Sequence, residues 1–156
     1  MSDWSQWLAV WGAAQATAIV FRPILEDLAR DVAKDAAKSY VGRCFQKVFS
    51  VIHKQPLTKA TGLAVKELLE LVENELIRAG IEEEELRDWT GDVRRFIEHG
   101  HVRQAIASLF MDPDYHLDPA TFASAWQQLS GAHALPDGFS WEFIAKRFAG
   151  KVAQIR

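Results

Sequence analysis

Seven residues, Leu135–Trp141 (LPDGFSW), decide how this chain folds, because they combine a helix stop, a turn and a helix start. A proline disfavours the helical conformation in the residue before it, so no helix runs through Leu135. Asp137 and Gly138 are residue types that favour a turn. Ser140 is a good N-cap, since its hydroxyl accepts from the free N–H groups of a first helical turn. The sequence therefore predicts a helix that begins at Trp141.

The segment after this junction has the periodicity of an amphipathic helix. Its apolar residues recur at steps of three and four: Trp141, Ile144, Phe148, Val152 and Ile155. Phe139 and Ile144 have the spacing of a hydrophobic staple, which sets the angle at which a chain enters a helix. The residues that define the junction and its docking face are Leu135, Pro136, Phe139, Ser140, Trp141, Ile144 and Phe148.

Similar patterns upstream predict further helices, and no segment is a convincing strand. A first helix is capped by Ser2 or Asp3. The others span about Pro23–Ile52, Lys59–Ala79, Glu82–Ile97, Val102–Phe110 and Pro119–Leu129. Gln55-Pro56 ends the long second helix, Thr58 caps the third, and Gly80 ends it. The buried stripe of that third helix is Ala60, Leu63, Ala64, Leu68, Leu71, Val72 and Leu76. The predicted fold class is all-α, a compact bundle of about six to seven helices with one long helix near the N-terminus.

Length and composition indicate a single globular domain over residues 1–156, about half of them apolar. The net charge of −3 argues against a nucleic-acid-binding domain, which is usually basic. One cysteine, Cys44, excludes a disulfide framework. The N-terminus lacks the basic region of a secretory signal, and the apolar stretch Trp7–Phe21 is shorter than the roughly 20 residues of a membrane span. We therefore expect a cytoplasmic protein.

Three tryptophans on the first predicted helix, Trp4, Trp7 and Trp11, have two interpretations. They could form a surface that docks on a partner or inserts into a bilayer. They could also be core residues, whose large rings gain burial area. We favour the core, because exposed apolar patches of that size are rare on monomers.

Every charged residue from Lys38 to Lys59 is basic, and the run contains Lys38, Arg43, Lys47, Lys54 and Lys59. It could form a surface that faces phosphate or lipid. It could equally be a solvated helix face whose charge is balanced by acids elsewhere. We favour the solvated face, because a charge run alone is weak evidence of a site.

The sequence contains no recognisable catalytic or cofactor motif, and no glycine-rich phosphate loop. His99 and His101 provide fewer ligands than zinc requires. The acids Glu82–Glu85 fit a helix start better than a calcium loop. Cys44 lies next to Phe45 within a predicted helix, which favours a buried small hydrophobe over a reactive thiol. We therefore expect no enzyme activity, no cofactor and no metal.

Several segments, in their order along the chain, resemble one protein family. They are Pro23-Ile24-Leu25, Asp31–Val41 (DVAKDAAKSYV), Phe45–Phe49 (FQKVF), Ala64–Leu68 (AVKEL), Glu75-Leu76 and the junction Leu135–Trp141. This set resembles the N-terminal helical domain of bacterial, especially cyanobacterial, NACHT proteins, which are NLR-like signal-transduction NTPases of the STAND class. The closing Leu-Pro-x-x-Phe-x-Trp pattern is the most specific segment, and none is a catalytic fingerprint.

The resemblance implies a module rather than a whole protein. In such proteins a NACHT NTPase follows the helical domain and a sensor follows the NTPase. Oligomerisation brings the N-terminal domains together, in many cases for defence against phage. The implied partners are the chain's own downstream NACHT domain, other copies of the protein and a downstream protein partner. ATP would bind the adjoining NTPase, and the family supplies no catalytic residues to transfer to this chain.

Three functions stay open at this point. The first is an interaction module that self-associates or recruits a protein when it is clustered. The second is a membrane-perturbing effector that inserts its tryptophan-rich first helix. The third is a nucleic-acid or phosphate binder that uses the basic run, including Lys38, Arg43 and Lys47, and the net acidity of the chain disfavours it.

Overall fold

The computed structural model describes residues 20–34, 39–45 and 54–155. Within these ranges the chain forms seven α-helices and one 3-10 helix and no strand, which confirms the predicted all-α bundle. The elements are α2 (Arg22–Lys34), α3 (Tyr40–Cys44), α4 (Lys54–Arg78), η3 (Glu83–Trp89), α5 (Thr90–Glu98), α6 (Gly100–Met111), α7 (Pro119–Gln127) and α8 (Trp141–Ile155). The first predicted helix lies outside the described residues.

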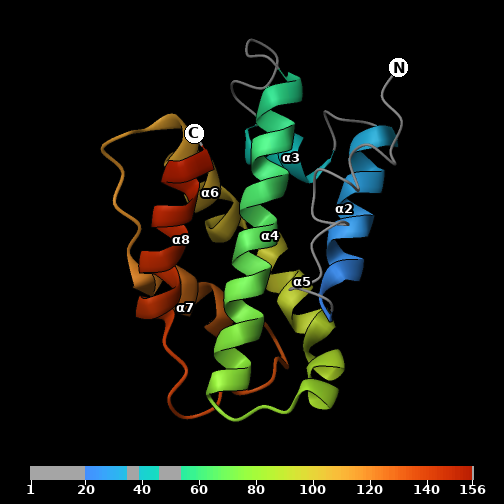
Figure 1. The fold of residues 1–156 in the computed structure, drawn as a ribbon, viewed down its shortest axis with the longest axis vertical. Helices are drawn as coiled ribbons and strands as arrows, with labels where there is room; N and C mark the ends of the chain where they lie inside the picture. Colours follow the sequence, from blue (N-terminus) through green and yellow to red (C-terminus); the bar gives the residue numbers. More distant parts are fainter. Residues whose placement is uncertain (1–19, 35–38, 46–53, 156) are drawn as a thin grey trace.

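Helix α4, with 25 residues, is the longest described element and runs through the middle of the bundle. Helix α2 packs against one side of it and α8 against another (Figure 1). Because α4 has neighbours on two sides, its buried residues exceed the single predicted stripe. Val65 and Leu69 lie outside that stripe and are fully buried, while Leu63 is only half-buried.

The prediction of one continuous helix over Pro23–Ile52 is wrong, because the helical conformation is interrupted at Ser39. This residue has an extended backbone, with φ −70° and ψ 173°, and its hydroxyl accepts from the N–H of Gly42 at 3.4 Å. Serine is suited to this role, since its short side chain competes for nearby backbone groups. Ser39 therefore caps the short helix α3, and the long helix of the bundle is α4.

The predicted start of the third helix is also wrong, because α4 begins at Lys54 and Thr58 lies within it. Pro56 occupies the first turn, where a missing N–H costs no helical hydrogen bond. The predicted end is confirmed: Gly80 has a φ of +111°. The N–H of Ile81 donates to the carbonyl of Leu76 at 2.9 Å, and the N–H of Gly80 donates to Ile77 at 3.0 Å. This pair of bonds is a Schellman motif.

The segment predicted as one helix from Glu82 has two parts. Its first part is the 3-10 helix η3, and its second part is α5. The buried positions expected there are nevertheless all buried: Leu86, Trp89, Val93, Phe96 and Ile97. Further along, Asp118 caps α7 as predicted, because its carboxylate accepts from the N–H of Ala120 at 2.9 Å.

A cluster of aromatic rings from η3, α5, α7 and α8 forms one part of the core. The rings of Phe96 and Trp141 stack with centroids 4.9 Å apart, and Phe122 meets Phe96 edge-on at 5.5 Å. Trp126 lies 6.0 Å from Trp89 and 6.3 Å from Trp141. The cluster thus packs α8 against η3, α5 and α7, all of which come earlier in the chain.

Candidate functional site

The turn and the N-cap before α8 have the geometry that the sequence predicts. Gly138 has a φ of +89°, which favours glycine. The hydroxyl of Ser140 accepts from the N–H of Phe143 at 3.1 Å, so Ser140 is the N-cap. The ring of Phe139 packs edge-on against Trp141, with centroids 4.8 Å apart. Leu135 and Pro136 are half-buried, while Ile144 and Phe148 are fully buried in the core.

Glu75 of α4 holds this junction in place. Its side chain is 1% exposed and forms a two-point ion pair with Arg78, at 2.7 and 2.6 Å. It also accepts from the backbone N–H of Ser140 at 2.7 Å. Arg78 in turn donates to the carbonyl of Gly138 at 2.5 Å. The bonds from Arg78 and Ser140 lower the pKa of Glu75, although burial opposes this.

A second polar contact holds the loop between α7 and α8. Asp92, in the first turn of α5, accepts from the backbone N–H of His133 at 2.9 Å and contacts its Nδ1 at 2.5 Å. The indole N–H of Trp126 donates to the carbonyl of His133 at 3.0 Å. Burial opposes ionisation of Asp92, but the contacts with His133 and Arg95 lower its pKa overall. The loop between α7 and α8 is therefore held at two points, by Asp92 at His133 and by Glu75 at Ser140.

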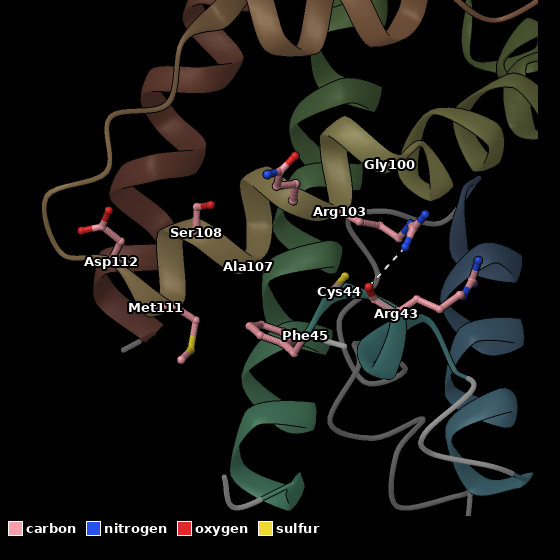
Figure 2. A pocket seen from close by; sticks show the side chains of 10 residues that line it. Arg43, Cys44, Phe45, Gly100, Arg103, Ala107, Ser108, Met111 and Asp112 are labelled. Carbon is pink, nitrogen blue, oxygen red and sulfur yellow. Dashed lines mark hydrogen bonds between the residues drawn. The ribbon is translucent and has the colours of Figure 1, made fainter. Parts of the chain in front are cut away.

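A groove of about 420 Å³ lies between α3 and α6. Figure 2 shows Arg43, Cys44 and Phe45 on one side, and residues of α6 together with Asp112, which follows this helix, on the other. The middle of the groove is apolar, with the buried ring of Phe45 across from Met111, which is 47% exposed. The guanidinium groups of Arg43 and Arg103 lie toward one end and Asp112 toward the other (Figure 2). The groove thus combines an apolar surface with charges of opposite sign.

Arg103 fixes the basic end of this groove. It donates to the carbonyl of Glu98 at 3.0 Å and to the carbonyl of Arg43 at 3.2 Å. The side chain of Arg43 pairs with Glu98 at 3.6 Å. Because α3 is only five residues long, these contacts to α6 and α5 position it.

Cys44 is buried in the wall of the groove, as predicted. Burial raises the pKa of its thiol to about 12. The neighbouring Tyr40 is fully buried and donates to the carbonyl of Ile97 at 2.9 Å. Since the thiolate is the nucleophilic form, this burial disfavours reaction of the Cys44 thiol.

The interaction residues proposed from the sequence are placed only in part. Arg43 lies in the groove and is paired with Glu98. The others lie outside the described residues: Trp4, Trp7, Trp11, Lys38 and Lys47. Sequence reasoning missed the groove itself, because it depends on how α6 lies against α3. The basic run that contains Arg43 was a signal for one wall of the groove.

The described ranges contain no group of three or more His, Cys, Asp or Glu side chains that could hold a metal ion. His99 instead caps α6, because its Nδ1 accepts from the N–H of His101 at 3.1 Å. None of the helices described has an apolar stretch long enough to cross a bilayer.

Residues 28–156 match the family model of the NACHT N-terminal helical domain 2. The chain belongs to this family. The match confirms the resemblance inferred from the sequence, and it includes both the junction and the groove. Pro23-Ile24-Leu25 and the three N-terminal tryptophans precede the matched residues. Searches of curated proteins and of solved structures gave no match. The domain is a helical, non-catalytic part of NACHT proteins.

Proposed function

We propose that this domain is the signalling or effector module of a NACHT-type STAND NTPase that acts in the cytoplasm in bacterial antiphage defence. Oligomerisation of the full protein brings several copies of the domain together. The clustered copies then self-associate or recruit a protein partner, while nucleotide hydrolysis belongs to the adjoining NACHT domain. The observation that carries this proposal is the match of residues 28–156 to a NACHT N-terminal helical family.

The groove between α3 and α6 supports a role in protein contact. Its apolar middle offers area that a partner side chain can bury, and the charges at its ends can orient that partner. Clustering raises the effective concentration of neighbouring domains, so even a weak contact becomes populated. A shallow surface of this kind is therefore sufficient for a module that acts only when it is oligomerised.

The test is to fuse residues 1–156 to a constitutive oligomeriser and to measure capture of an untethered second copy and of host proteins. Met111→Glu, in the groove, should lower capture about tenfold, which corresponds to roughly 1.4 kcal/mol. Ile77→Glu is the matched control, since Ile77 is 43% exposed on α4 and Met111 is 47% exposed. Equal loss in both variants would exclude the groove as the contact. A folded fusion that captures neither a second copy nor any specific protein would contradict the interaction module.

The same fusion separates this function from the membrane-perturbing alternative. Dye release from liposomes is measured with the clustered domain and with the monomer as control. Absence of leakage from a folded, oligomeric fusion is the result expected of an interaction module. Leakage only on clustering would instead favour an effector that inserts into membranes. In that event, joint replacement of Trp4, Trp7 and Trp11 by alanine should abolish the leakage.

A further inference from the structure

Helix α8 exposes an aromatic side chain in its first turn. Phe143 is 42% exposed, whereas Trp141 and Phe148 of the same helix are buried. The guanidinium of Arg147 lies 4.8 Å from the centre of the Phe143 ring. Aromatic and arginine side chains are enriched in the buried centres of protein interfaces. This pair therefore has the composition of a contact surface.

The exposed side chains around Phe143 carry charges in a fixed order along α8. Glu142 precedes it, and Lys146 and Arg147 follow it about one turn later; all three are exposed. Residues four positions apart share a helix face, so Glu142 lies beside Lys146 and Phe143 lies beside Arg147. From the start of the helix, this face presents an acid, an aromatic ring and then two bases.

The groove between α3 and α6 presents the complementary order of charges. The bonds from the Arg103 guanidinium to described residues go to two backbone carbonyls, which hold it in place without neutralising its charge. Phe45 and Met111 form the apolar middle (Figure 2). Asp112 lies at the other end, just after the C-terminus of α6, where the helix dipole is also negative.

We propose that Phe143 of one copy inserts into the groove between α3 and α6 of a second copy, so that clustered domains associate head to tail. Glu142 then lies against the basic end of the groove, and the two bases of α8 lie against its acidic end. The inference rests on the proposed function, because it names a second copy as the occupant of the groove described there.

The sizes of the two surfaces are compatible. A groove of about 420 Å³ is in the range of pockets that hold small organic molecules, so it has room for a phenyl ring. The rise of a helix places Arg103 and Asp112 about 13 Å apart along α6. Glu142 and Arg147 are roughly 8 Å apart along α8, and their long side chains can extend over the difference.

The ring and the groove belong to different parts of the molecule. The start of α8 lies beside the C-terminal part of α4, where the N–H of Ser140 donates to Glu75, whereas α3 lies near the opposite end of α4 (Figure 1). Among the described residues, the lining of the groove comes from residues 43–45 and 100–112. The contact is therefore heterologous. Each associated copy keeps a free ring or a free groove, from which a closed ring or a filament can grow.

The test uses the clustered fusion of residues 1–156 as bait and an untethered copy as prey. Phe143→Glu in both bait and prey removes every inserting ring, so capture should fall about tenfold. The matched control pairs a Phe143→Glu bait with a Met111→Glu prey. The bait then keeps an intact groove and the prey an intact ring, so one of the two orientations remains. Capture should be about half that of the wild type.

Charge reversal is a second test that leaves the ring and the groove in place. Asp112→Lys should lower capture about threefold, because the groove then repels the bases of α8. Joint Lys146→Glu and Arg147→Glu in the same chain should restore capture, because the facing charges are again opposite. A folded chain in which capture is not restored would overturn the proposed orientation.

Three further results would overturn the head-to-tail contact, with each variant shown to be folded by circular dichroism. The first is wild-type capture when bait and prey both carry Phe143→Glu. The second is a mixed pair that captures no more than this doubly substituted pair. The third is a wild-type fusion that captures host proteins but no second copy, which leaves the proposed function in place. That function fails only if the wild-type fusion captures neither.

Discussion

At the scale of single residues, Glu73 and Glu75 show that partners decide the charge state of a buried carboxylate. Both lie on α4, two positions apart, and they are 5% and 2% exposed. Yet the pKa of Glu73 is raised and that of Glu75 is lowered. Glu75 has a guanidinium beside it, whereas Glu73 has two further carboxylates nearby. Burial alone would raise both pKa values.

Glu75→Gln should lower the free energy of unfolding by about 2 kcal/mol at neutral pH, because Arg78 and the N–H of Ser140 lose a charged acceptor. The pKa of Glu75 is lowered from 4.5. Its contribution is therefore complete above about pH 4.5 and is lost as pH falls through the lowered pKa. Urea unfolding at pH 7 and pH 3 measures both effects.

The control for this prediction is Glu67→Gln, since the ion pairs of Glu67 with described residues are long, at 4.0 Å to Lys66 and to Lys151. It should change stability by less than about 0.5 kcal/mol. If Glu75→Gln lowers the free energy of unfolding no more than this control does, the stability of the junction does not depend on Glu75.

At the scale of elements, helix ends with a local chemical signal follow the sequence. Asp118 and Ser140 cap their helices through their own side chains, and Gly80 closes α4. The predicted helix bounds were wrong where a residue type is compatible with both a helix interruption and a helix start. Ser39 breaks a helix that its neighbours would continue, and Pro56 begins a helix rather than following one.

Two glycines should respond in opposite ways to alanine. Gly80→Ala forces a side chain into a φ of +111°, so it should cost about 1 kcal/mol. Gly150 lies within α8, and a methyl group there would meet no atom within 4 Å. Gly150→Ala should therefore stabilise the protein by about 0.5–1 kcal/mol. Thermal unfolding of both variants gives the comparison, and a stabilising Gly80→Ala would contradict the Schellman end of α4.

At the scale of the whole molecule, the aromatic cluster connects the junction to the rest of the bundle. Trp141 contacts rings from α5 and α7 as well as Phe139 of the junction. The cluster accounts for Trp89, Trp126 and Trp141 as core residues, with each at most 9% exposed. The Leu135–Trp141 segment therefore helps to dock α8, because its Trp141 packs into the aromatic cluster.

Trp141→Ala should lower the free energy of unfolding by about 4 kcal/mol, because it leaves a cavity between α5, α7 and α8. Phe143→Ala is the control, since Phe143 is on the same helix and 42% exposed. It packs with the guanidinium of Arg147 at 4.8 Å and should cost less than about 1 kcal/mol. Equal losses, measured by urea unfolding, would refute the central position of Trp141.

Some features of the candidate site were accessible from the sequence, and others were not. The capped junction and the burial of Cys44 could be predicted, because each depends on neighbouring residues or on residue type. The groove could not, because Arg43 and Arg103 are 60 positions apart and meet only when α3 lies on α6. Nor could the periodicity of α4 show that the helix is buried on two sides.

By itself, the sequence determined the helical class, the turn at Gly138 and the cap at Ser140, since these follow from periodicity and short-range chemistry. The family resemblance was also present in the order of the motifs. Only the tertiary structure decided that α4 is the central helix and that Glu73 and Glu75 ionise differently. The burial of α4 depends on where α2 and α8 lie, and the pKa of Glu75 depends on the N–H of Ser140, 65 positions away, as well as on Arg78 of the same helix. No local pattern encodes the approach of those distant groups.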